Sequence, residues 1–221
     1  DIVKKGNGFK VSNCSHKFDN LSEFLERERN DLIIVYRWMF HLYPIDGYQL
    51  DMPTKNNAGA KEKERFREHF VFLDGDYSST EVAKTASLKR FIEKLAGASH
   101  RTFILSSVPE VSYDIERVNR DYYIKSGWSE VLSELSIGYN EYLTRNSFMN
   151  KFFSNHQFSN TTIVSIENVF CNSFIEGRCV AQYQGLPLYY DDDHLSLEGA
   201  DLVVEFIMEQ IKNAEANIRG N

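Results

Sequence analysis

Continuous apolar runs alternate along the chain with segments of helical periodicity. The runs DLIIVYRW at residues 31–38 and RTFILSSVP at residues 101–109 are typical of buried parallel strands. Residues 79–97 combine a capping-box start, apolar positions at helical spacing and a terminal glycine, and therefore predict a helix. This alternation of strand and helix predicts an α/β domain.

The rest of the chain extends this pattern. Residues 1–8 predict the end of a helix that stops at Gly6 or Gly8, and polar residues 44–65 predict an excursion over the surface. The further predicted elements are strands at 9–13 and 161–170 and helices at 21–30, 138–153 and from Ser196 onward. We expect a three-layer α/β/α sandwich with a parallel sheet, formed as a single domain over residues 1–221, with sites at the carboxyl ends of the strands.

Composition and charge narrow the classes of partner. The chain of 221 residues is 42% hydrophobic, which is enough for a core, and its formal net charge is −7. Basic residues are scattered among acidic ones, so we expect no nucleic-acid partner. There is no apolar run of roughly 20 residues that could cross a bilayer and no signal-peptide core near the start. Any export signal or anchor is expected outside this sequence.

The most informative stretch is DDDHLS at residues 191–196, directly before a predicted helix. A carboxylate three residues before a histidine can accept the imidazole Nδ1 proton and leave Nε2 as a base, so we predict Asp191 and His194 as an acid–base pair. Asp192 and Asp193 are expected to face solvent or cap the helix. Two alternatives stay open: the aspartates favour the helix dipole, or they hold a metal. Because no second ligand cluster with suitable spacing is present, we expect no metal and no cofactor.

Cys171 and Cys179 lie eight residues apart in the polar, glycine-containing segment CNSFIEGRC, which can close on itself. The alternatives are a local disulfide, two reduced thiols, or a bridge from either cysteine to Cys14.

The block YYDDDHLSLEGADLV resembles the last motif of the SGNH hydrolases, and in particular of the SGNH domains fused to membrane acyltransferase-3 proteins that acylate surface polysaccharides. Three weaker features are similar to that subfamily: an Arg37-Trp38 pair at the end of the third strand, a strand ending in Pro-Glu, and the pair Cys171 and Cys179 ahead of the last block. The resemblance spans nearly the whole chain. It implies a flavodoxin-like sandwich, a disulfide between these two cysteines, and an extracytoplasmic location.

The resemblance also implies a Ser-His-Asp mechanism on O-acyl esters of a glycan, with a fused or associated membrane acyltransferase partner. The family serine lies in a Gly-Asp-Ser block after the first strand. No matching serine is present, and this chain is expected to begin beyond that strand. Ser78 or Ser79, before a predicted helix, and the segment 13–16 are weaker internal substitutes.

Three residues are candidates for oxyanion or substrate contact. Asn13 ends the predicted strand 9–13, which takes the place of the family's second strand, where the resemblance implies an oxyanion contact. Arg37 can donate to an oxyanion or a glycan carboxylate, and Trp38 can stack on a sugar. The alternatives are an Arg37 paired with surface acids and a Trp38 in the core. We expect an O-acetyltransferase or acetylesterase, and a non-catalytic glycan-binding or scaffolding module of the same fold is the alternative.

Overall fold

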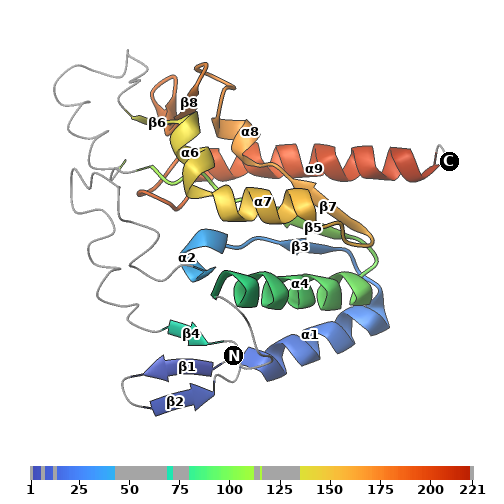
Figure 1. Cartoon of the computed structure of the whole chain (residues 1–221). Helices are drawn as coiled ribbons and strands as arrows, with labels where there is room; N and C mark the ends of the chain where they lie inside the picture. The colour runs from blue at the N-terminus through green and yellow to red at the C-terminus, as the bar shows by residue number, and fades with distance from the viewer. Residues whose placement is uncertain are drawn as a thin grey trace. The chain divides into compact units, whose positions relative to one another are not determined.

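The computed structural model describes residues 2–5, 8–11, 14–42, 69–71, 80–111, 115 and 135–219 (Figure 1). The chain divides into two compact units that alternate along the sequence. Unit 1 consists of residues 1–49, 65–105 and 148–163, and unit 2 of residues 50–64, 106–147 and 164–221. Among the helices of the described residues, none is both long enough and apolar enough to cross a membrane.

The central sheet has the strand order β3-β5-β7, with bounds β3 (Leu32–Ile34), β5 (Thr102–Leu105) and β7 (Thr161–Val164). Strands β3 and β5 are parallel, and every residue of β5 is buried. A parallel strand covered on both faces is expected to be continuously apolar, which is why this run was visible in the sequence. The parallel three-stranded sheet and its helices confirm the predicted α/β class.

The core of unit 1 lies between this sheet and the helices α1 (Cys14–Glu28), α4 (Thr80–Ala98) and α7 (Ser147–Asn155), of which α1 and α4 run side by side in Figure 1. Its buried side chains are Leu25, Ile34, Trp38, Met39, Leu88, Ile92, Leu95, Ala98, Ile104, Phe148, Met149 and Phe152. The predicted helix at 79–97 is confirmed. The predicted helix at 138–153 is two helices, α6 (Tyr139–Arg145) and α7, which are separated at Asn146.

An ion pair lies at the start of strands β3 and β5. The Arg101 guanidinium donates to the Asp31 carboxylate, with Nε 3.0 Å from Oδ1, and Leu32 N–H donates to the Arg101 carbonyl at 2.8 Å. This hydrogen bond from Arg101 holds the pKa of Asp31 below its ordinary value of 3.8, although burial opposes the shift.

The helix end predicted for residues 1–8 is wrong. Strand β1 (Ile2–Lys5) pairs antiparallel with β2 (Gly8–Val11) and with β4 (His69–Val71). Four residues are too few to show a helical period, and a partner strand more than sixty residues away leaves no local signal. The strand predicted at 9–13 is confirmed as β2 over residues 9–11, and residues 12 and 13 lie outside the described residues. The excursion predicted for residues 44–65 lies outside the described residues.

Unit 2 contains α6, α8 (Glu167–Phe170), α9 (Leu197–Arg219) and two short antiparallel pairs. The pairs are β6 (Ser136–Gly138) with β8 (Arg178–Val180) and β9 (Gln182–Tyr183) with β10 (Leu186–Pro187). The helix predicted from Ser196 is confirmed as α9. The strand predicted over 161–170 ends at Val164, and its second half is the short helix α8.

Candidate functional site

The candidate site is a tight loop between β10 and α9. Tyr189 and Leu195 form an antiparallel bridge, and the Tyr190 N–H donates to the His194 carbonyl at 2.7 Å. The Ser196 N–H then donates to the Leu188 carbonyl at 3.1 Å. The loop 191–194 is therefore closed at its base by backbone hydrogen bonds.

The start of α9 is hydrogen-bonded to strand β10. Ser196 Oγ accepts the Gly199 N–H at 3.1 Å, as an N-cap residue does, and donates to the Pro187 carbonyl at 2.7 Å. A Cβ atom on Gly199 would lie 2.0 Å from the Leu188 carbonyl oxygen. Glycine therefore permits the close approach that sets the position of the loop relative to the helix.

Asp191 is bound to His194 in two ways. Its Oδ2 lies 2.8 Å from the His194 Nδ1, and its Oδ1 accepts the backbone N–H groups of His194 at 2.7 Å and Asp193 at 3.0 Å. Burial acts to raise the pKa of Asp191, but the hydrogen bonds from the two backbone N–H groups and from the imidazole together lower it. Asp191 is thus an anionic acceptor at neutral pH. The geometry is that of the predicted acid–base pair, whose catalytic role stays a prediction.

Asp193 does not lie where we expected it. Its side chain is only 5% exposed, and its Oδ1 lies 3.1 Å from the His194 Nδ1. The hydrogen bond from its N–H to Asp191 turns the chain back within two residues, and this turn brings the Asp193 side chain to the imidazole. Neither solvent exposure nor helix capping describes it. The spacing rule that identified Asp191 gave no signal for this second carboxylate.

The metal alternative uses the same side chains. Ligand-type atoms of Asp191, Asp193 and His194 lie within 4.8 Å of one another. Because these atoms are already paired as carboxylate and imidazole, the arrangement fits a hydrogen-bonded base without any ion, and a metal-free control separates the two interpretations.

Segment 106–111, which follows β5, is hydrogen-bonded to the loop 191–194. Its Val111 N–H donates to the Asp192 carbonyl at 2.8 Å. Three side chains donate to its own carbonyl groups at 3.1, 3.0 and 2.7 Å: Tyr142, Arg145 and Tyr189, respectively. The loop thus rests on a segment whose backbone is fixed at several points.

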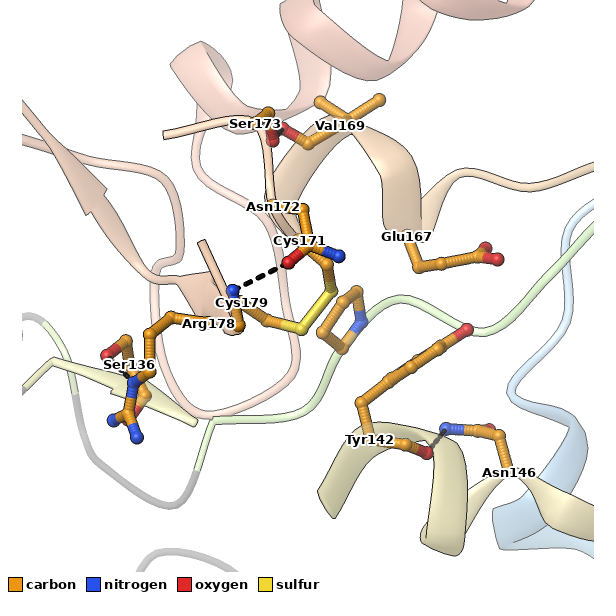
Figure 2. Close-up of a disulfide and its surroundings, with 12 residues drawn as sticks. Ser136, Tyr142, Asn146, Glu167, Val169, Cys171, Asn172, Ser173, Arg178 and Cys179 are labelled. Atoms are coloured by element: carbon orange, nitrogen blue, oxygen red, sulfur yellow. Dashed lines mark hydrogen bonds between the residues drawn. A yellow bond between two sulfur atoms is a disulfide. The ribbon is translucent and has the colours of Figure 1, made fainter. Parts of the chain in front are cut away.

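A second polar cluster lies at the carboxyl ends of neighbouring strands. Ser106, directly after β5, donates to the carboxylate of Glu167, which begins α8 after β7. Figure 2 shows the Tyr142 hydroxyl pointing towards the space that the Glu167 carboxylate faces. Burial raises the pKa of Tyr142, and the Glu167 charge raises it further, so Tyr142 is a neutral donor. Sequence reasoning missed this cluster, although Ser106 lies in the apolar run 101–109 and Glu167 in the predicted strand 161–170, which was the available signal.

The disulfide between Cys171 and Cys179 is confirmed (Figure 2). Inside the ring that it closes, the Asn172 N–H donates to the Arg178 carbonyl at 2.9 Å, and the Asn172 side chain accepts the Gly177 N–H at 2.7 Å. Gly177 has a φ of 72°, a conformation that favours glycine. A bridge from Cys14 is therefore wrong.

The remaining candidates are placed as follows. Trp38 begins the short helix α2 (Trp38–Leu42) instead of ending a strand, and it is only 1% exposed. Its Nε1 donates to the Leu105 carbonyl at 2.8 Å, so Trp38 is a core residue and not a sugar platform. Arg37 is half-buried in unit 1, and its contact with an oxyanion or a glycan carboxylate stays a prediction. Asn13, Ser78 and Ser79 lie outside the described residues.

Comparison with known proteins gives one match. The family model described as "SGNH domain (fused to AT3 domains)" matches residues 3–209, a range that contains the loop 191–194 and the disulfide. A search of curated proteins found no significant match, and a search of solved structures found none either.

Proposed function

Because the chain belongs to the family of SGNH domains fused to AT3 domains, a group with a hydrolase or acyl-esterase type of fold, we propose that it acts on O-acyl esters of a glycan as a transferase or esterase. The observation that carries this proposal is the 2.8 Å contact between Asp191 and the His194 Nδ1. A carboxylate at this nitrogen prepares Nε2 to accept a proton.

The proposed reaction has two acyl-transfer steps. A serine Oγ attacks the ester carbonyl while His194 Nε2 takes the hydroxyl proton, and the proton passes to the sugar oxygen as the ester bond breaks. A second hydroxyl, from water or from an acceptor sugar, then attacks the acyl-serine in the same way. The serine is expected in a Gly-Asp-Ser block ahead of residue 1. Exclusion of water from the site decides between transfer and hydrolysis.

An exposed aromatic residue beside the base supports a sugar as substrate. The Tyr190 N–H donates to the His194 carbonyl at 2.7 Å, so the two residues are neighbours at the base of the loop, and Tyr189 beside them is buried. Tyr190 as a whole residue is 64% exposed, and the His194 side chain is 68% exposed. A tyrosine ring offers an apolar face on which a sugar ring can stack.

Location and partner follow from the family and the disulfide. The family description names fusion to AT3 domains, which supports a membrane acyltransferase partner. The bond between Cys171 and Cys179 is of the kind that persists in oxidising compartments, and it supports a location on the extracytoplasmic side.

The test is acetate release from an acetylated sugar by the natural protein that contains this sequence. We expect His194→Ala to abolish nearly all turnover and Asp191→Asn to lower kcat by up to about 10⁴-fold. Asp192→Asn is the matched control and should retain most of the activity, since Asp192 contributes its carbonyl to Val111.

Full activity in His194→Ala would refute the proposal. An inactive protein that has the Gly-Asp-Ser block and still binds acetylated glycan would point instead to a binding or scaffolding module.

A further inference from the structure

We propose that Asp193 is a second positioning residue for His194 and that it shares with Asp191 the task of keeping the imidazole proton on Nδ1. This inference deepens the proposed function and takes its catalytic meaning from it. Its geometry and its test do not depend on any turnover.

The contacts of His194 carry the first step. Two carboxylate oxygens approach one ring nitrogen, from Asp191 at 2.8 Å and from Asp193 at 3.1 Å. A neutral imidazole carries a single N–H, and an ionised carboxylate can only accept. Both contacts are satisfied by the tautomer with hydrogen on Nδ1. That tautomer leaves the Nε2 lone pair available, as a general base requires.

The two carboxylates differ in their exposure to solvent. The Asp191 side chain is 34% exposed, and one of its oxygens already accepts two backbone N–H groups, whereas the Asp193 side chain is 5% exposed. A hydrogen bond to a charged group is stronger where water is excluded, because the local dielectric is lower. Asp191 therefore shapes the loop as well as orienting the ring, while Asp193 provides the more shielded acceptor.

The loop explains why His194 needs this support. The imidazole side chain is 68% exposed, so little surrounding packing fixes its rotamer or its tautomer. In water, a histidine ring without a specific partner favours the tautomer with hydrogen on Nε2. In that tautomer Nε2 has no free lone pair and cannot accept the serine proton. Removing one carboxylate should weaken the preference for Nδ1–H, and removing both should reverse it.

The test is the tautomer of His194 in the 221-residue chain, read from its imidazole ¹⁵N chemical shifts at a pH where the ring is neutral and with EDTA present. We expect Nδ1–H in the native protein. Asp193→Asn should lower the ratio of Nδ1–H to Nε2–H by about tenfold, which is what a charge-assisted hydrogen bond supplies. The double variant Asp191→Asn with Asp193→Asn should show mainly Nε2–H, and Asp192→Asn is the matched control with no change.

Two results would overturn the proposal. One is an unchanged ratio in both Asp193→Asn and Asp193→Ala together with a complete switch in Asp191→Asn alone, because Asp191 would then act without help. The other is a native tautomer that changes when EDTA is added, which would assign the three side chains to a metal. Backbone amide spectra show that each variant is folded. Loss of the tautomer effect with acetate release intact would reject this inference alone, and the converse result would reject only the proposed function.

Discussion

Gly199→Ala tests whether the approach of α9 to Leu188 holds the loop in place. The added Cβ would lie 2.0 Å from the Leu188 carbonyl oxygen and 2.9 Å from its carbonyl carbon, whereas real Cβ contacts essentially never fall below 3.0 Å. The helix start and Leu188 must therefore separate by about 1 Å, because backbone atoms cannot rotate away. That movement breaks the hydrogen bond from the Ser196 N–H to the Leu188 carbonyl, now 3.1 Å long.

The magnitude follows from three effects. Overpacking costs about 1–3 kcal/mol, and the lost hydrogen bond costs about 1 kcal/mol. The higher helix propensity of alanine stabilises the folded chain by at most about 1 kcal/mol. We expect Gly199→Ala to lower the free energy of unfolding by about 2 kcal/mol, which for a chain of this size shifts Tm by about 4–8 °C.

Urea unfolding followed by circular dichroism measures this change, and Gly97→Ala is the matched control. Gly97 lies in α4, is exposed, and has no heavy atom within 4 Å of a Cβ built on it. The control should therefore be neutral or more stable by up to about 1 kcal/mol. A Gly199→Ala protein as stable as the native one would refute the reasoning, since it would show that α9 can shift without loss.

Three further predictions concern other features. Replacing Cys171 and Cys179 with alanine should lower the free energy of unfolding by about 2–3 kcal/mol, measured by urea unfolding, because a nine-residue ring then opens in the unfolded chain. Asp31→Asn should destabilise by about 1 kcal/mol at pH 7. The pKa of Asp31 is lowered in the folded chain, so the stabilisation by the ionised carboxylate is fully present above pH 3.8, the pKa of the unfolded chain. This stabilisation is lost as the pH falls through the lower pKa of the folded chain, where the unfolding curves of the variant and the native protein should converge. Tyr190→Ala should raise KM for an acetylated sugar by about tenfold while Tyr190→Phe does not, since stacking needs only the ring; equal KM values in both variants would contradict the platform.

The parts of the fold that were predictable carry strong local signals. The sequence of α4 combines capping-box residue types, helical periodicity and a glycine near its end, and β5 is buried at every position and apolar from Phe103 to Leu105. Helix α9 begins directly after Ser196, whose Oγ accepts the N–H of Gly199, three residues further along the chain. Such elements depend on near neighbours, so a single sequence is sufficient to find them.

The parts that were not predictable depend on distant partners. Strand β1 exists because Ile2 pairs with Val11 and Val71, and the latter partner is far along the chain. In the site, the spacing of Asp191 and His194 predicted their contact. The buried position of Asp193 depends on the closure of the loop by Tyr190 and His194, which no spacing rule describes.

The burial of the disulfide has a consequence for how the protein matures. Cys171 is 3% exposed and Cys179 is fully buried, and the same residues pair as an isolated bridge beside β8. An oxidant or isomerase can reach these sulfur atoms only before this region packs, because thiol–disulfide exchange requires direct access to sulfur. The bond must therefore form before this region packs. Once the region has packed, a reductant in the medium can act only as fast as the region opens.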